Sequence, residues 1–185
     1  MISIKSKQLI FLVLFQFALL NVANAQTFVD KNVSVKLFSS TPLEDIKATS
    51  TAGTAVLVPL RQELAVQVPI KSLAFEKKMM QEHFNENYME SDRYPTAKFS
   101  GVIEQKIDWT KDGEYAVTAK GTLTVHGVAK ARTIGGRIAV NAGVITFSST
   151  FEVACAAHKI EIPSLVFTKI AEVIKVTVQS KLTSK

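Results

Sequence analysis

A period-two alternation of apolar and polar residues runs through most of the chain and constrains its fold more than any other feature. In residues 114–126, Val117 and Leu123 share one phase, while Thr118 and Thr122 share the other. Successive side chains of a strand point to opposite faces, so this pattern places one face of each strand in a core and the other in water. The sequence therefore predicts an all-β protein.

Eight segments carry this alternation, and short turn motifs separate several of them. The segments are residues 33–40, 45–58, 62–70, 97–107, 114–126, 131–140, 144–156 and 169–182. The turn motifs are Lys111-Asp112-Gly113, His126-Gly127 and Asn141-Ala142-Gly143, all typical of hairpins, which join antiparallel neighbours. Closing such a meander removes its exposed edges, so we expect an antiparallel eight-stranded β-barrel with room for side chains or one small ligand.

One segment departs from the strand pattern. Residues 72–88 place Phe75, Met79, Phe84 and Tyr88 at spacings that gather them on one face of a helix. Ser72 is a favourable N-cap residue for it. We therefore expect an amphipathic helix inserted between two strands of the barrel.

The first 25 residues have the pattern of a secretory signal peptide. Two lysines precede an apolar run over residues 9–20, and Ala23-Asn24-Ala25 forms a small-x-small cleavage site. The apolar run is shorter than the roughly 20 residues that a membrane-spanning helix needs. We expect cleavage after Ala25, one folded domain over residues 26–185, and a periplasmic or secreted protein.

Charge and cysteine content narrow the classes of function. The formal net charge is +6, yet no run of five or more basic residues occurs, so nucleic-acid binding is not expected. Mild basicity is compatible with a transient contact with a membrane surface. Cys155 is the only cysteine, which excludes an internal disulfide. The sequence leaves open whether the protein forms a homodimer.

The residue types that usually carry catalysis do not assemble into a pattern. No two of the three histidines, His83, His126 and His158, lie within thirty residues of each other, whereas zinc sites usually include a closely spaced pair of ligands. Cys155 falls on the apolar phase of its strand, where a thiol is normally inert. Catalytic residues and a metal site are therefore not expected.

Two histidines and a pair of glycines have simple structural interpretations. We interpret His126 as a turn residue, because histidine tolerates left-handed backbone angles better than most residues. His83 is expected to pack on the barrel with its ring hydrogen-bonded to backbone. Gly135-Gly136 lies inside a strand pattern without the residues of a phosphate loop, which favours a β-bulge.

Three blocks of sequence carry a family resemblance. Residues 72–101 read SLAFEKKMMQEHFNENYMESDRYPTAKFSG, residues 121–133 read GTLTVHGVAKART, and residues 171–182 read AEVIKVTVQSKL. The first resembles the helix, Tyr-Pro step and aromatic strand start of the YceI-like family of exported polyisoprenoid-binding proteins. The second is similar to that family's Leu-Thr-Ile/Val-His-Gly-Val-x-Lys hairpin, and the third, more weakly, to its closing strand.

This resemblance implies an elongated, lipocalin-like barrel that holds an isoprenoid tail and performs no catalysis. It implies no cofactor beyond a bound isoprenoid lipid or quinone. Family members often carry histidines in their first strand, whereas residues 30–40 here contain none. Head-group contacts from that strand are therefore not carried over to this chain.

Inward-facing apolar residues of the strands, with two residues of the helix, form the predicted ligand-binding site. They are Val66, Val68, Met79, Phe84, Phe99, Ile103, Val117, Leu123, Phe147, Phe151, Val153, Ile174 and Val176. The predicted function is to carry or sequester a long-chain isoprenoid-like lipid. Two alternatives stay open: a stress-response or interaction barrel without ligand, and a lipid-modifying enzyme that uses His83 or His126 as a base.

Overall fold

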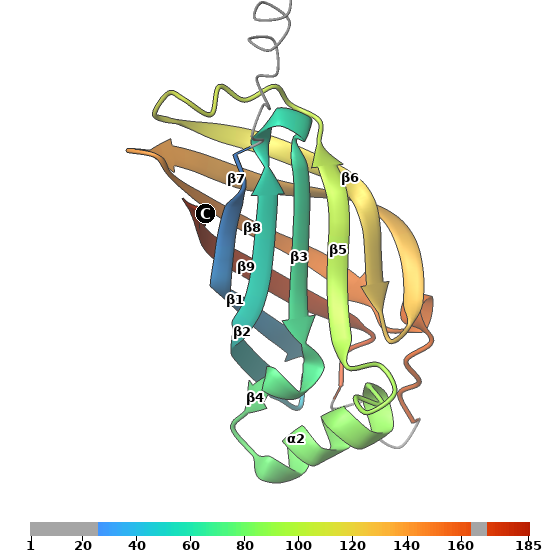
Figure 1. The fold of residues 1–185 in the computed structure, drawn as a ribbon. Coiled ribbons are helices and arrows are strands. Elements are labelled where there is room, and N and C mark those ends of the chain that lie inside the picture. Colours follow the sequence, from blue (N-terminus) through green and yellow to red (C-terminus); the bar gives the residue numbers. More distant parts are fainter. Residues whose placement is uncertain (1–25, 164–169) are drawn as a thin grey trace, which may run out of the picture.

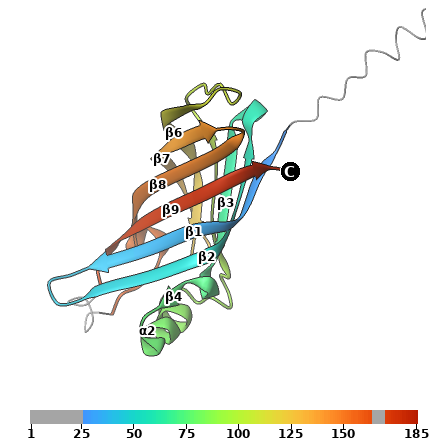
Figure 2. The same ribbon diagram turned by 90° about the vertical axis from the view of Figure 1, so that its left-hand side faces the viewer.

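Strand pairing in this protein closes on itself. The computed structural model describes residues 26–163 and 170–185, so the predicted signal peptide lies outside the described residues. The strands are β1 (Phe28–Ser40), β2 (Asp45–Val58), β3 (Glu63–Pro69), β4 (Ala74–Phe75), β5 (Thr96–Ile103), β6 (Gly113–Val125), β7 (Val128–Asn141), β8 (Val144–Ala154) and β9 (Val173–Ser184). They follow the order β1-β9-β8-β7-β6-β5-β3-β2, and β1 also pairs with β2. This closure confirms the predicted antiparallel eight-stranded barrel (Figures 1 and 2), to which the two-residue β4 adds a short pairing with β2.

The two-residue turns form where glycine or a tolerant residue allows positive φ. His126 and Gly127 have φ of 48° and 70° between the paired residues Val125 and Val128. Ala142 and Gly143 have φ of 47° and 75° in the β7–β8 turn. Positive φ at both central residues is the geometry that matches the twist of a hairpin. The interpretation of His126 as a turn residue is thus confirmed.

The β5 strand is shorter than the alternation predicted. It ends at Ile103, and the expected continuation to Ile107 is wrong. Gln105 is the physical reason, because its side chain takes over the bonding of Thr118 on β6. Gln105 Oε1 accepts a hydrogen bond from Thr118 N at 2.7 Å, and Gln105 Nε2 donates to Thr118 Oγ1 at 2.9 Å. The chain then leaves the sheet and crosses one end of the barrel before β6 begins (Figure 1).

The helical insertion begins later than expected. Helix α2 spans Lys78–His83 and continues as a π-helical turn, Phe84–Tyr88. Ser72, the predicted N-cap, instead lies in a 3-10 turn and donates its hydroxyl to Pro69 O at 2.6 Å. β4 occupies the first turn of the predicted helix, held by Gln81, whose side chain bonds Phe75 N. Pairing of β4 with β2 therefore overrides the helical periodicity of this segment.

The barrel has one closed end and one open end. At the closed end, which carries the connection over residues 104–112, the interior is packed by Leu57, Ile145 and Leu182, each exposed by 1% or less. Trp109 packs against this core from the connection. Helix α2 lies at the opposite, open end (Figure 1). The two ends therefore offer different environments along the same barrel axis.

Candidate functional site

A cavity of about 550 Å³ occupies the part of the barrel nearer to α2. The thirteen residues of the predicted site all line it. They are Val66, Val68, Met79, Phe84, Phe99, Ile103, Val117, Leu123, Phe147, Phe151, Val153, Ile174 and Val176. The volume lies within the range of sites that hold a single small molecule. Contact of these residues with a ligand stays a prediction.

Several inward-facing residues are only half-buried, which shows that the cavity is not filled by its own side chains. Val66, Val117, Phe151 and Ile174 lie on the inward phase of their strands, yet each keeps intermediate exposure. Because these residues line the cavity, their free surface faces its interior. An apolar molecule in the cavity would therefore cover apolar surface that is otherwise exposed.

The helical segment lies across the open end. Phe84 packs against Phe75 with ring centroids 4.8 Å apart. Met89, just after the π-helical turn, is buried. Met79 lines the cavity but is 64% exposed, so it forms part of the rim. Flexible methionine side chains adapt readily to ligands of different shape.

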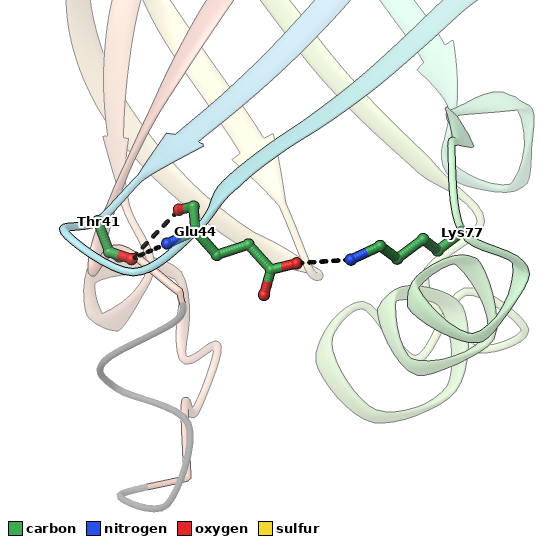
Figure 3. A network of polar contacts seen from close by, with 3 residues as sticks. All are labelled: Thr41, Glu44 and Lys77. Atoms are coloured by element: carbon green, nitrogen blue, oxygen red, sulfur yellow. Dashed lines mark hydrogen bonds and ion pairs between the residues drawn. The ribbon is translucent and has the colours of Figure 1, made fainter.

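An ion pair joins the two sides of the open end (Figure 3). Lys77 Nζ, just before α2, lies 2.9 Å from Glu44 Oε1, in the turn just before β2. Glu44 is in turn fixed by Thr41, whose hydroxyl accepts a hydrogen bond from Glu44 N. The hydrogen bond to the Glu44 carboxylate raises the pKa of Lys77 above its ordinary value. Both residues line the cavity, so its rim is charged while its wall is apolar.

The segment that follows β8 completes the rim. Ile160, Ile162 and Ile170 line the cavity beside Cys155. Cys155 is buried, and burial raises the pKa of its thiol. A thiol with a raised pKa is a poor nucleophile at neutral pH. This agrees with the interpretation of Cys155 as packing.

A sequence profile of the YceI-like domain matches residues 21–182. The chain belongs to the YceI-like domain family. No curated protein matches it.

Three solved structures share the fold of this YceI-like domain. A polyisoprenoid binding domain from Saccharophagus degradans is 13% identical, with a TM-score of 0.72, and the alignment covers 87% of this chain and 99% of that one. BcnA from Burkholderia cenocepacia is 14% identical, with a TM-score of 0.67 over 82% of this chain and 96% of its own. The YceI protein of Campylobacter jejuni is 16% identical, with a TM-score of 0.56 over 90% and 88%. At these identities the similarity establishes the shared fold.

The histidines of the YceI-like domain have distinct surroundings. His126 is buried, with Nδ1 3.2 Å from His158 O and Nε2 3.0 Å from Glu90 Oε1. Its ring also meets the Tyr94 ring edge-on at 4.6 Å. His83 is exposed on the rim, so the expectation that it packs on the barrel is wrong. The next residue, Phe84, takes the packed position against Phe75 instead.

No clustered metal-binding or membrane-spanning element is found within residues 26–163 and 170–185. No group of three or more His, Cys, Asp or Glu side chains is placed to hold a metal ion there. In the same described residues, no helix has the length and apolar character needed to cross a membrane.

Several residues of the cavity were not among the predicted site residues. Val35 and Leu37 of β1 and Ile46 and Ala48 of β2 also line it. The sequence alternation already placed these residues on one face of their strands. Which strands surround the cavity depends on the order of strands in the barrel, and that order is not given by alternation. Glu44 and Lys77 carried no sequence signal, because the residues are 33 positions apart and meet only after the barrel closes.

Proposed function

We propose that this YceI-like domain binds a long-chain apolar molecule of isoprenoid type, such as an isoprenoid lipid or quinone, and carries or sequesters it without chemical turnover. The observation that carries this proposal is the cavity: about 550 Å³, open at one end, with apolar side chains on its wall. The polyisoprenoid binding domain of Saccharophagus degradans, which shares the fold, supports the chemical class.

The energetics favour a chain over a compact polar ligand. Burial of each methylene contributes about 0.8 kcal/mol, so a chain of many carbons gains affinity without strong polar contacts. The charged rim at Glu44 and Lys77 suits the polar end of such a molecule, which stays near water while the chain occupies the barrel. A cleaved signal peptide ending at Ala25 would deliver this carrier to the periplasm or the medium.

The proposal is tested with the endogenous ligand and a matched pair of variants. Native mass spectrometry and solvent extraction of the purified protein are expected to yield a long-chain lipid, and added isoprenoid is expected to raise the thermal unfolding midpoint. Val117→Trp should fill the cavity and abolish both effects, because Val117 lines it. Thr122→Trp is the control, since Thr122 lies on the same strand but faces solvent. Repeated absence of lipid, with no thermal shift in the unmodified protein, would refute the proposal.

Both alternatives are disfavoured by the same geometry. A barrel packed solid would leave no cavity, whereas this one has an apolar interior space. An enzyme that used His126 as a base would need the His126 ring beside the cavity. His126 is not among the residues that line the cavity, and its two ring nitrogens lie at hydrogen-bond distance from Glu90 and His158. His83 reaches the rim without a buried partner to orient it. Unchanged lipid after prolonged incubation is the expected result for the unmodified protein.

A further inference from the structure

The wall of the barrel is incomplete between β7 and β8. Backbone pairing joins residues 137–141 to residues 144–148 and then stops. By contrast, β7 pairs with β6 along nearly its whole length, and β8 pairs with β9 from Ile145 to Ala154. In the described residues, the first nine residues of β7 therefore have no ladder to β8.

Side chains bridge this gap in place of the backbone. Ser149 Oγ donates a hydrogen bond to Gly135 O at 2.6 Å, and Arg132 Nη2 donates to Glu152 O at 2.7 Å. Both bonds are exposed, and in each of them a side chain supplies the donor for a carbonyl that has no ladder partner across the gap. Two side-chain hydrogen bonds thus replace a continuous backbone ladder. The unpaired parts of β7 and β8 are therefore held together by fewer hydrogen bonds than the paired parts.

The cavity reaches the gap. Most strands contribute alternate residues to the lining, such as Leu64, Val66 and Val68. On β7 and β8, consecutive residues line it instead: Gly135, Gly136, Arg137, Ile138, Phe147, Ser148 and Ser149. Consecutive residues of a strand face opposite sides of the sheet, so the cavity extends into the thickness of the wall. Gly135 is exposed, and a Cβ added there would meet nothing within 4 Å, so this residue of the lining also faces open solvent.

A pair of histidines closes the gap at its lower end, beside the open end of the barrel. His158 Nδ1 lies 3.0 Å from Val128 O at the start of β7, and His126 Nδ1 lies 3.2 Å from His158 O. His158 belongs to the 3-10 turn Ala156–His158 that follows β8. The gap is thus a window in the wall, bounded by the Arg137–Ser148 pair above and the two histidines below.

We propose that this window is a side opening through which an apolar chain enters and leaves the cavity. The inference rests on the proposed function. The open end of the barrel is crossed by α2 and spanned by the Glu44–Lys77 ion pair, so a chain that passes there meets the helical segment and its charged pair. A chain that passes through the window meets no backbone ladder, only the two side-chain hydrogen bonds that bridge β7 and β8 there. The groups at its edge also let the polar end of a lipid pass without losing all hydrogen-bond partners.

Chemical staples test the route. In a Cys155→Ala background, Thr133→Cys with Glu152→Cys places two exposed thiols across the window, and a short bis-maleimide joins them. The control is Glu152→Cys with Lys175→Cys, which are direct partners across the intact β8–β9 ladder. A third pair, Glu44→Cys with Lys77→Cys, staples the open end. Stopped-flow fluorescence of cis-parinaric acid then gives uptake and release rates for each protein before and after stapling.

The window staple is expected to slow uptake and release alike, by about tenfold, with the dissociation constant unchanged, as for a blocked gate. The β8–β9 staple should leave both rates as they were. Equal slowing by these two staples, or slowing by the open-end staple alone, would overturn the proposal. If unstapled protein takes up no parinaric acid or isoprenoid, the proposed function itself is overturned, and the side opening with it.

Discussion

Truncation of two residues on strand β9 is expected to separate stability from ligand binding. Leu182 and Ile174 both face inward on β9, but Leu182 is fully buried at the closed end, whereas Ile174 is half-buried and lines the cavity. Leu182→Ala should lower the free energy of unfolding by about 2–5 kcal/mol, because it removes buried atoms and leaves a void. Ile174→Ala should cost only about 1 kcal/mol, since part of its surface already faces the cavity.

Ligand binding should show the reverse order. Ile174→Ala removes contact with roughly one methylene of a bound chain, worth about 0.8 kcal/mol, and so weakens binding about fourfold. Leu182→Ala should leave the dissociation constant unchanged, because Leu182 does not line the cavity. Urea unfolding followed by circular dichroism measures the first quantity, and titration with cis-parinaric acid measures the second.

This pair of measurements can refute the division of the barrel into a packed end and a binding end. Equal losses of unfolding free energy would mean that Ile174 is packed as tightly as Leu182. Weaker binding in Leu182→Ala, with binding intact in Ile174→Ala, would place the ligand at the closed end. Either result contradicts the cavity as the binding site.

Three further outcomes follow from the surroundings of single residues. Gly136→Ala should destabilise the fold by about 1–3 kcal/mol, because its Cβ would lie 2.7 Å from Ser148 O, whereas Gly135→Ala should be nearly neutral in the same urea unfolding assay. Burial opposes ionisation of Asp30, but hydrogen bonds from Asn32 N, Ser180 Oγ and Lys181 N outweigh it and lower the pKa of the carboxyl. The ionised Asp30 carboxylate therefore stabilises the fold fully above its unfolded-state pKa, and this stabilisation is lost as the pH falls through its folded-state pKa. Asp30→Asn should accordingly be less stable than the unmodified protein at pH 7, and the difference in unfolding free energy should shrink below about pH 4. Because burial raises the pKa of Cys155, its reaction with a disulfide reagent should be slow until unfolding, and slower still with a chain in the cavity.

The strands and their inward faces could be predicted because both depend on local alternation. Val117 and Leu123 face inward for the same reason that Thr122 faces water, and no distant residue alters that. The end of β5 and the start of α2 could not be predicted in this way. Each depends on a side chain that replaces a backbone partner, Gln105 in one case and Gln81 in the other. A side chain can take the place of a backbone hydrogen-bond partner in this way only when the neighbouring segment is in place.

The glycine pair shows the same limit at the wall of the barrel. A bulge was the prediction for Gly135-Gly136, yet β7 stays in register with β6 through both residues. The irregularity falls on the other side of β7, where the ladder to β8 ends at Arg137. A strand has two edges, and period-two alternation describes its faces, so the sequence carried no signal about which edge is unpaired.

Alternation predicts which residues face inward, but it does not predict at which end of the barrel those residues leave a cavity. An eight-stranded barrel is just wide enough for its own side chains to fill it. At the closed end, Leu57, Ile145 and Leu182 are fully buried in one core cluster, and Trp109 packs against it from the connection that crosses that end. Toward α2, half-buried side chains such as Val66 line the cavity, and the helical segment crosses this end of the barrel. Which side chains share a level depends on the stagger of the closed ladder, so the same inward phase builds a packed core at one end and a binding space at the other.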